Sequence, residues 1–519
     1  MARYKPYSYA QGKLIPIYFE KQILPGTFEY SLNHLIDHEL DLSIFDERYK
    51  NEETGAPAYD PRILLKIVLF AYSRGMVSSR RIAQACEENI IFMALSCDTK
   101  PHFTTIADFV ATMDKEIVHF FRDVLLVCDA LGLIGKEMFA IDGCKLPSNA
   151  AKEWSGTRAD FEKKAAKMEA TIGRILEKHR EQDQTPTDGM IVMREKKFVE
   201  TLGKKVVKIR EWLGHNDDKA GKTGKARKSN ITDNESAKMK TSRGVLQGYD
   251  GVTAVDSKHQ IIVHAKAFGE PQEHDLLQPM VEGVQENFQA IGKEENIFAK
   301  TKLAADSGFH TEKNMEMLFT GQIDAYVADN CFRKRDPRFA EYDRYKERTK
   351  KDRKERAKRE GHHALFAAKD FIFDKDLRYC LCPAGKRLYR SGANVVVKNF
   401  RAYKFKGPKS SCLPCALRSQ CLRHPERTEI RQVAYFVGRS EKGLNTFTER
   451  MKRKIDSAVG GVLYGMRLAI SEPPFSHITS VIGLDRFTLR GKIKVNTQWN
   501  LFCITHNLKR IHRYGLAMA

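Results

Sequence analysis

Between residues 136 and 330 the sequence changes from a helical hydrophobic period to short apolar runs, and this change restricts the fold more than any other feature. Runs typical of strands lie at residues 138–141, 252–255 and 261–264, and residues 256–258 form a turn between the last two. Strands separated by short turns pair with their neighbours along the chain. The pattern therefore predicts a meander of three strands at the start of an α/β domain.

The sequence then alternates between helix and strand. A helical stripe covers residues 276–284, a strand covers 303–305, a second helix covers 311–319, and a further strand covers 323–327. A meander followed by alternating helices and strands forms a mixed sheet with helices on its faces. This order fits a ribonuclease H-like core.

Three acidic residues lie at the edges of these elements. Asp142 follows the first apolar run, Asp306 follows the run at 303–305, and Glu472 closes a helix that carries Tyr464 and Arg467. A single Asp after a strand is usually a turn or cap residue. Carboxylates that a fold brings together can hold Mg²⁺ or Mn²⁺ for phosphoryl transfer. The combination of three acids in a basic chain favours the catalytic interpretation.

The charge of the chain points to a polyanionic partner. Lys and Arg outnumber Asp and Glu by 88 to 66, which gives a formal charge of +22 over 519 residues. The excess is concentrated at residues 219–228 and 346–359, and basic clusters of this kind favour nucleic acid over a mere solubility surplus. No run approaches the roughly 20 apolar residues that span a bilayer, and the first residues lack a signal-peptide core. We therefore expect a cytoplasmic protein with no membrane segment.

The N-terminal region reads as an all-α domain. Its three short helices are predicted to begin at Asp60-Pro61, at Ser78 or Ser79, and at Thr104 or Thr105 with Asp108 in a capping position. Proline at the first helical position and short polar side chains at the cap are common start signals. Short helices joined by tight turns suit a helix-turn-helix-like DNA reader. A helical dimerisation or packing domain is the alternative.

A long insertion follows the first strand, at residues 152–229. Its two apolar stripes have spacings of three and four and comprise Phe161, Ala165, Met168, Ile172 and Ile175, then Phe198, Leu202, Val206, Ile209 and Leu213. Such spacings are typical of amphipathic helices, and residues 185–189 supply a turn between them. We expect an antiparallel helical hairpin whose stripes pack on each other, with a dimer seam as the alternative.

Five cysteines are close together in a basic region at residues 331–445. Cys412 and Cys415 form a CxxC knuckle, and Cys382 lies in a Cys-Pro-Ala-Gly-Lys turn. Together with Cys421 they give four thiolates, which suit a structural Zn²⁺, and Cys380 is the alternate first ligand. Buried free thiols, or a redox dithiol, are the alternatives. A closed site of this kind has no open position for catalysis.

Motifs spread over nearly the whole chain resemble those of DDE transposases of bacterial insertion sequences, in particular the IS1182-like group of the IS4/IS5 assemblage. The stretches that carry the resemblance are residues 59–109, 141–143, 230–233, 248–250, 305–309, 472–475, 489–492 and 506–510. The family is similar in having a Tyr-x2-Arg signature upstream of its third acid, which Tyr464 and Arg467 match.

The spacing within this signature differs from its commonest form. Four residues, rather than three, separate Arg467 from Glu472. On a straight helix the two side chains would lie roughly 140° apart, at about 100° per residue. A π-bulge, or a helix that unwinds before Pro473, could absorb the difference. Glu449 and Asp456 remain possible substitutes for Glu472.

The resemblance implies a role for each site residue. Asp142 would bridge two Mg²⁺ ions, and Asp306 and Glu472 would each complete one of them. The residues expected to contact phosphate are Tyr464, Arg467, Lys145 and Arg490.

The resemblance also implies an activity: the protein would bind the terminal inverted repeats in double-stranded DNA, cut them, and join them to target DNA, as a homodimer in the DNA complex. A nuclease without strand transfer, or a non-catalytic DNA-binding relative, is the alternative.

We expect four regions along the chain. They are a helical DNA-binding domain at 1–130, the first part of the catalytic core at 136–330 with the insertion at 152–229, the cysteine-rich insertion at 331–445, and the helical end of the core at 446–519.

Overall fold

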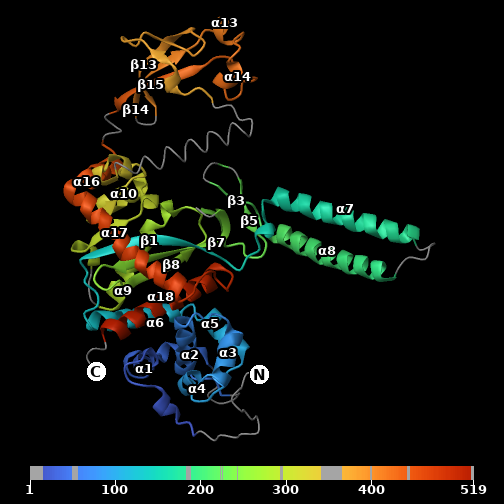
Figure 1. Ribbon diagram of the computed structural model, residues 1–519, viewed down its shortest axis with the longest axis vertical. Helices are drawn as coiled ribbons and strands as arrows, with labels where there is room; N and C mark the ends of the chain where they lie inside the picture. Colours follow the sequence, from blue (N-terminus) through green and yellow to red (C-terminus); the bar gives the residue numbers. More distant parts are fainter. Residues whose placement is uncertain are drawn as a thin grey trace, which may run out of the picture. The chain divides into compact units, whose positions relative to one another are not determined.

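The computed structural model describes residues 16–49, 57–182, 189–221, 224, 226–241, 244–292, 296–339, 365–397, 400–440 and 445–515 (Figure 1). The chain forms two compact units: Met1–Ala304 with Met466–Ala519, and Ala305–Gly465. Each unit is described by itself below. The basic run at 346–359 and the predicted turn residues 185–188 lie outside the described residues, as does part of the run at 219–228.

The first unit is built on a sheet centred on two long antiparallel strands, β1 (Met138–Pro147) and β7 (Gly244–Asp256). Strands β6 (Ala237–Thr241) and β8 (Ile262–Phe268) pair with the other edge of β7, and β9 (Lys302–Ala305) lies next to β1. The predicted strands and the hairpin between β7 and β8 are confirmed.

The expectation that the first strand ends at Asp142 is wrong. Asp142 pairs with Thr253 in the middle of β1, and the pairing continues to Pro147 opposite Gly248. The reason is that β7 begins as early as Gly244, so residues 248–252 can pair with the polar half of β1. The residues before and after Asp142 in β1 are therefore all paired with β7, which fixes the backbone at Asp142.

Two helices cover opposite faces of this sheet. On one face Phe139 stacks on Phe288 of α9 (Leu277–Ala290), with ring centroids 5.8 Å apart. On the other face Trp499 of α18 (Lys492–Tyr514) packs against Gly251, where a Cβ atom would lie 3.0 Å from the indole. Because Gly251 is opposite Cys144 in the register, Asp142 shares the α18 face.

Helix α18 also closes the edge of the sheet. Asn507 accepts from the Ile262 N–H and donates to the Ile262 carbonyl, both at 2.9 Å. Three turns earlier Asn496 makes the same pair of bonds with Ala267, at 2.8 and 3.0 Å. The two amides thus satisfy backbone groups that the edge strand β8 would otherwise leave open.

The N-terminal part of the first unit is all-helical, as expected. Its helices are α1 (Phe28–His34), α2 (Pro61–Ser73), α3 (Ser79–Glu88), α4 (Ile90–Leu95), α5 (Phe103–Thr112) and α6 (Glu116–Ala130), with short turns Phe19–Gln22, Leu35–Glu39 and Ser43–Arg48. Asp60 caps α2, accepting from the Arg62 N–H at 2.7 Å.

The predicted start of α5 is wrong. The helix begins at Phe103, and His102 is its N-cap. The imidazole Nδ1 of His102 lies 2.8 Å from the Thr104 hydroxyl and accepts from the Thr104 N–H. A ring nitrogen thus takes the place of the short oxygen side chain that usually signals a helix start.

The insertion forms the expected antiparallel hairpin of α7 (Arg158–Gln182) and α8 (Gly189–His215), which run side by side in Figure 1. Short strands lie at its base: β2 (Ser155–Gly156) pairs with β5 (Ser229–Asn230), and β3 (Lys219–Ala220) pairs with β4 (Ala226–Arg227).

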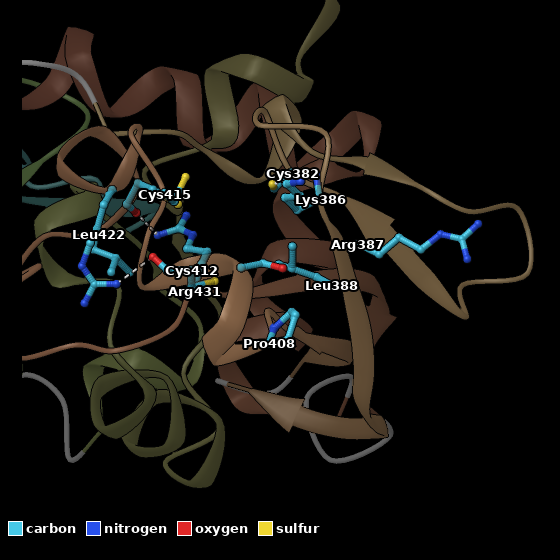
Figure 2. A pocket seen from close by; sticks show the side chains of 12 residues that line it. Cys382, Lys386, Arg387, Leu388, Pro408, Cys412, Cys415, Leu422 and Arg431 are labelled. Carbon is cyan, nitrogen blue, oxygen red and sulfur yellow. Dashed lines mark hydrogen bonds between the residues drawn. The ribbon is translucent and has the colours of Figure 1, made fainter.

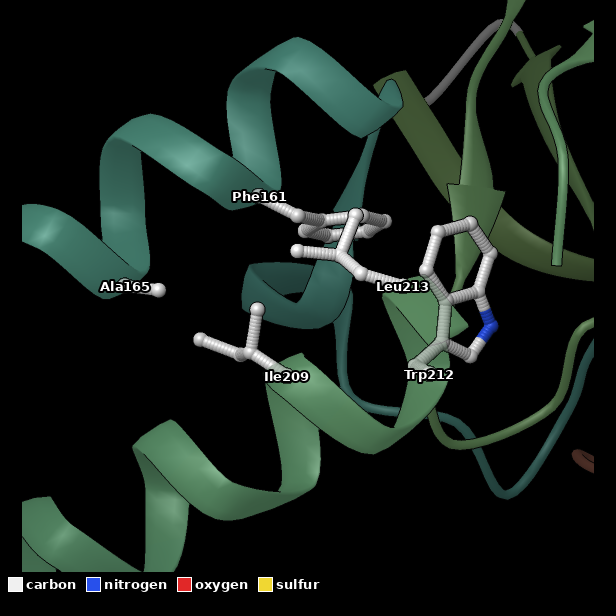
Figure 3. Packing of buried hydrophobic residues seen from close by; sticks show 5 residues of the cluster. All are labelled: Phe161, Ala165, Ile209, Trp212 and Leu213. Carbon is white, nitrogen blue, oxygen red and sulfur yellow. The ribbon is translucent and has the colours of Figure 1, made fainter. Parts of the chain in front are cut away.

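The two stripes pack on each other at the base of the hairpin. There Phe161 meets Trp212 edge-on, with Ala165, Ile209 and Leu213 completing the cluster (Figure 3). Further out, Phe198 is 50% exposed. Mutual packing is therefore confirmed at the base of the stripes, and Leu202, farther out, is buried as well.

The second unit contains α10 (Glu312–Thr320), β10 (Ala325–Val327), α11 (Phe332–Arg335) and α16 (Phe447–Asp456), with 3-10 turns at Ser307–Phe309, Pro337–Phe339 and Ala368–Asp370. It also contains an antiparallel sheet in chain order: β11 (Ile372–Phe373), β12 (Tyr379–Leu381), β13 (Arg387–Val397), β14 (Phe400–Lys406) and β15 (Gln432–Arg439). Two short helices, α13 (Lys409–Cys412) and α14 (Arg418–Cys421), join β14 to β15. This sheet has its own core of Phe371, Cys380, Leu388, Phe405 and Val433.

Helix α17 (Ala458–Ser476) begins in the second unit and ends in the first. The expected π-bulge or unwinding before Pro473 is wrong, because the helix runs through Pro473 and Pro474 and a π turn (His477–Val481) follows it. Proline removes the donor that the Ala469 carbonyl needs. Gln260 supplies a replacement, donating from Nε2 to that carbonyl at 3.1 Å. Among the described residues, no helix has the length and apolar character needed to cross a membrane.

Candidate active site

Asp142 lies on the face of the sheet that α17 covers. Its Oδ2 atom pairs with the guanidinium of Arg467 and accepts from the Ser471 hydroxyl at 3.0 Å, and its Oδ1 atom accepts from the Gly143 N–H at 2.8 Å. Hydrogen bonds and an opposite charge of this kind favour the ionised carboxylate. Asp142 is therefore held in place by an ion pair with a buried guanidinium and by hydrogen bonds to both of its oxygens.

The partners of Asp142 are four residues apart on α17, so they share one face of the helix. Arg467 is only 6% exposed and Ser471 is fully buried. Arg467 was expected at the site and Ser471 was not. Its position, one helical turn after Arg467, is the signal that points to it.

Glu472 follows Ser471 and is exposed. On this continuous helix, at about 100° per residue, it points roughly 100° away from Ser471 and roughly 140° away from Arg467. In the first unit the structure therefore brings Arg467 to Asp142, with Glu472 on the adjoining exposed side of the same helix.

Asp306 and Tyr464 belong to the second unit. Asp306 caps the short turn Ser307–Phe309 directly after β9, with its carboxylate 3.4 Å from the Gly308 N–H. Tyr464 packs edge-on against Phe332 of α11, with centroids 5.1 Å apart. The three predicted acids are thus divided between the two units, and each lies at or beside a well-defined element.

The two substitutes for Glu472 are held by ion pairs in the second unit. Glu449, near the start of α16, is buried and lies 3.3 Å from the Lys452 ammonium. Asp456, at the end of α16, receives two bonds from Arg335, at 2.8 and 2.9 Å. Both contacts lie at the ends of α16.

Lys145 lies on the opposite face of β1 and has acidic partners of its own. It pairs across the sheet with Asp250, and its ammonium lies 3.0 Å from the Glu273 carboxylate. Asp250 is fully buried, and no N–H or hydroxyl of the described residues donates to its carboxylate oxygens.

Burial, and then the charges of Glu273 and Asp142, raise the pKa of Asp250 to about 7 despite the nearby Lys145. Gly143 leaves room for this acid, since a Cβ atom there would lie 2.8 Å from Asp250 Oδ1. The sequence analysis did not single out Asp250 or Glu273.

Arg490 lies in the turn before α18. It is exposed, and its Nε atom donates to the Asn149 carbonyl at 2.6 Å. Gly491 follows with a φ of 83°, a conformation that glycine adopts without strain. Arg490 therefore ties the turn to the chain after β1 and still presents a charge to solvent.

The four cysteines chosen as zinc ligands line one small cavity of about 30 Å³ in the second unit (Figure 2). In this view Cys382 lies across the cavity from Cys412 and Cys415. Cys421 lines it too, whereas Cys380 does not and is buried in the core of the sheet. Cys380, the alternate ligand, is thus the one thiol of the five that does not line this cavity.

The thiols influence one another. Burial raises the pKa of Cys421 and the other three lining thiols raise it further, although Arg431 opposes them. The Lys386 N–H donates to Cys382 Sγ at 3.3 Å. Even so, no three His, Cys, Asp or Glu side chains within the described ranges are arranged to hold a metal ion as they stand.

Two transposase family models match the chain. A transposase domain model (DUF772) matches residues 17–112, the N-terminal helices, and a transposase DDE domain model matches residues 381–512. Both matches support a DDE transposase. The resemblance predicted from sequence motifs is thereby confirmed. The DDE match includes Arg467 and Glu472, while Asp142 and Asp306 precede it.

Matches to these two transposase domains indicate an enzyme that acts on DNA. No curated protein matches the chain in sequence.

Proposed function

We propose that this transposase binds the terminal inverted repeats of an insertion sequence, cuts the DNA there and joins the ends to target DNA. The proposal depends on one observation above all: a buried Arg467 and a buried Ser471 hold the Asp142 carboxylate as an anion in the middle of the central sheet. Taking two charges out of water costs free energy that a hydrophobic pair of similar volume would not, so an ion pair kept at this depth favours a functional role over a purely structural one.

We further propose that Asp142, Asp306 and Glu472 hold Mg²⁺ or Mn²⁺, within a ribonuclease H-like core. The donor chemistry fits, because all three are carboxylates and Asp142 already balances a positive charge where α17 meets the sheet. A bound divalent ion would activate water and stabilise the leaving oxygen of a phosphodiester. Asp142 would supply its ionised oxygens, and Arg467 would place its guanidinium beside the phosphate. Tyr464 and Arg490 are the further phosphate contacts in this proposal. Lys145, which was also expected to contact phosphate, is left out of it because it lies on the face of β1 opposite Asp142 and is bonded to Glu273.

The assay for this function uses full-length protein, Mg²⁺, DNA that carries the element ends, and a target plasmid. Wild type should yield cut ends and joined products. Asp142→Ala should lose both, by at least about a thousandfold, while DNA affinity stays within about threefold, because it removes a negative charge from a phosphate site. Asp485→Ala, which removes an exposed acid on the same unit, is the control.

The products separate the alternatives. Cuts without joined product would show a nuclease, and specific DNA binding without cuts would show a non-catalytic relative. Cutting by Asp142→Ala at the wild-type level would overturn the proposed site.

We also propose a structural Zn²⁺ held by Cys382, Cys412, Cys415 and Cys421. Four thiols lining one cavity, one of them accepting a backbone N–H, are the donors that Zn²⁺ prefers. Elemental analysis of the purified protein should give about one zinc per chain, lost in the double variant Cys412→Ser, Cys415→Ser and retained in Cys380→Ser. The proposal would be overturned if the purified wild type contained no zinc and its unfolding temperature did not fall after treatment with a chelator.

The remaining assignments concern DNA recognition. We propose that the helices of residues 1–130 recognise the element ends and that two copies pair the ends in a homodimer. Footprinting of end DNA with the full-length chain, and light scattering with and without that DNA, test the two statements. Equal protection of end DNA and of random-sequence DNA would contradict the first statement. A monomer on saturating end DNA would contradict the second.

A further inference from the structure

The sheet of the second unit has one covered face and one open face. Cys380, Leu388 and Phe405 occupy the covered face as core residues. Tyr379 pairs with Tyr389, and Tyr389 pairs with Lys406, each one position out of phase with that core. Successive strand residues alternate between faces, so these side chains lie on the other side, here called the outer face. The outer face includes Tyr379, Arg387, Tyr389, Phe400, Lys404, Lys406 and Phe436.

The outer face exposes large aromatic rings. Tyr389 is 58% exposed and Phe436 is 52% exposed. Phe400 meets Phe436 edge-on at 6.0 Å, which holds the latter ring upright on the sheet without covering it. Exposed aromatic side chains grouped on one rigid face mark an interaction surface.

The charge of the sheet is entirely positive. The five strands contain no Asp or Glu and six basic residues: Arg387, Arg390, Arg401, Lys404, Lys406 and Arg439. On the outer face the cations stand among the rings, with the Arg387 guanidinium 4.4 Å from the centroid of Tyr379. A face of this composition complements a polyanion that also offers flat apolar groups.

We propose that the outer face binds an unpaired DNA strand, with bases stacked on Tyr389 and Phe436 and phosphates against Lys404 and Lys406. In a duplex the faces of the bases are hidden by stacking, and rings on a flat sheet have nothing to contact. A single strand presents both its bases and its phosphates, and aromatic platforms with interspersed cations bind it with little sequence preference. The proposal deepens the proposed function, since an enzyme that cuts DNA ends must hold a freed strand.

The test measures binding of full-length protein to a fluorescent oligo-dT of about 15 nucleotides, within the site size of single-strand binders, in a buffer without Mg²⁺ or Mn²⁺ and without chelator. Tyr389→Ala and Phe436→Ala should each weaken oligo-dT binding about tenfold. Each should weaken binding of a duplex of equal length by less than about threefold. Phe198→Ala removes an equally exposed ring from the helical hairpin and should change neither affinity.

The phosphate contacts have their own readout. The double variant Lys404→Gln, Lys406→Gln should reduce the slope of log affinity against log salt by about 1.4, from about 0.7 per phosphate on a single strand. Because the buffer contains no Mg²⁺ or Mn²⁺, failure of the proposed catalysis would leave these measurements unchanged.

Three results would overturn the proposal. They are wild-type affinity in both aromatic variants, an equal loss of single-stranded and duplex binding, and a loss of self-association in light scattering with no change in oligo-dT affinity. The last result would show that the outer face is an interface between copies of the chain.

Discussion

The environment of Asp142 shows how neighbouring groups orient a carboxylate. Arg467 balances its charge, Ser471 orients one oxygen, and the Gly143 N–H orients the other. A change at any of the three should alter how readily Asp142 takes up a cation. Asp250, on the opposite face of the same strand, has the reverse environment: its carboxylate is buried without a donor, and its pKa is about 7.

Asp250 gives a prediction about pH. Between its ordinary pKa of 3.8 and about 7 the unfolded carboxyl is ionised while the folded one keeps its proton. The folded state therefore binds more protons, and the free energy of unfolding falls as the pH rises through this window. Asp250→Asn should flatten that fall by up to about 4 kcal/mol, at 1.36 kcal/mol per pH unit.

The measurement is urea unfolding in EDTA at about pH 5 and about pH 8, followed by tryptophan fluorescence, for wild type and variant. All three tryptophans, Trp154, Trp212 and Trp499, lie in the first unit, so the signal reports that unit. An unchanged pH dependence in Asp250→Asn would show that the buried carboxyl is ionised throughout.

At the scale of elements, what the sequence predicts depends on whether a signal is local. The strands at 138–141 and 252–255 are apolar runs, and their prediction is confirmed. The polar half of β1 has no such signal and is a strand only because β7 pairs with it. Helix α17 likewise continues through Pro473 because Gln260, from a distant turn, replaces a lost donor. Such tertiary compensation cannot be read from a local pattern.

The edge of the central sheet gives a prediction about stability. Asn507→Ala would leave the N–H and carbonyl of Ile262 buried without partners, which should destabilise the first unit by about 2–4 kcal/mol. Asn500→Ala is the matched control on the same helix, since among the described residues the Asn500 amide bonds only to a carbonyl of its own helix, one turn earlier, and should cost less than about 1 kcal/mol. Equal unfolding midpoints in urea for the two variants would contradict this role of α18.

At the scale of the whole molecule, the family and the α/β class could be predicted from the order of motifs and the excess of positive charge. The division of the site could not. Asp142, Arg467 and Glu472 belong to one compact unit, while Asp306 and Tyr464 belong to the other. The sequence places all five on one catalytic core, because neither periodicity nor spacing reveals where a chain of this length separates into units.

Single-turnover strand transfer by full-length protein, with Mn²⁺ and DNA carrying the element ends, tests the central claim most directly. The variants are Asp142→Asn, Asp306→Asn and Glu472→Gln, which keep the side-chain shapes and remove one charge each, and Asp485→Asn is the control. The account predicts that each of the three loses joined product by at least about a thousandfold while the control matches wild type. Joined product at the wild-type level from Glu472→Gln, or from either Asp variant, would contradict it.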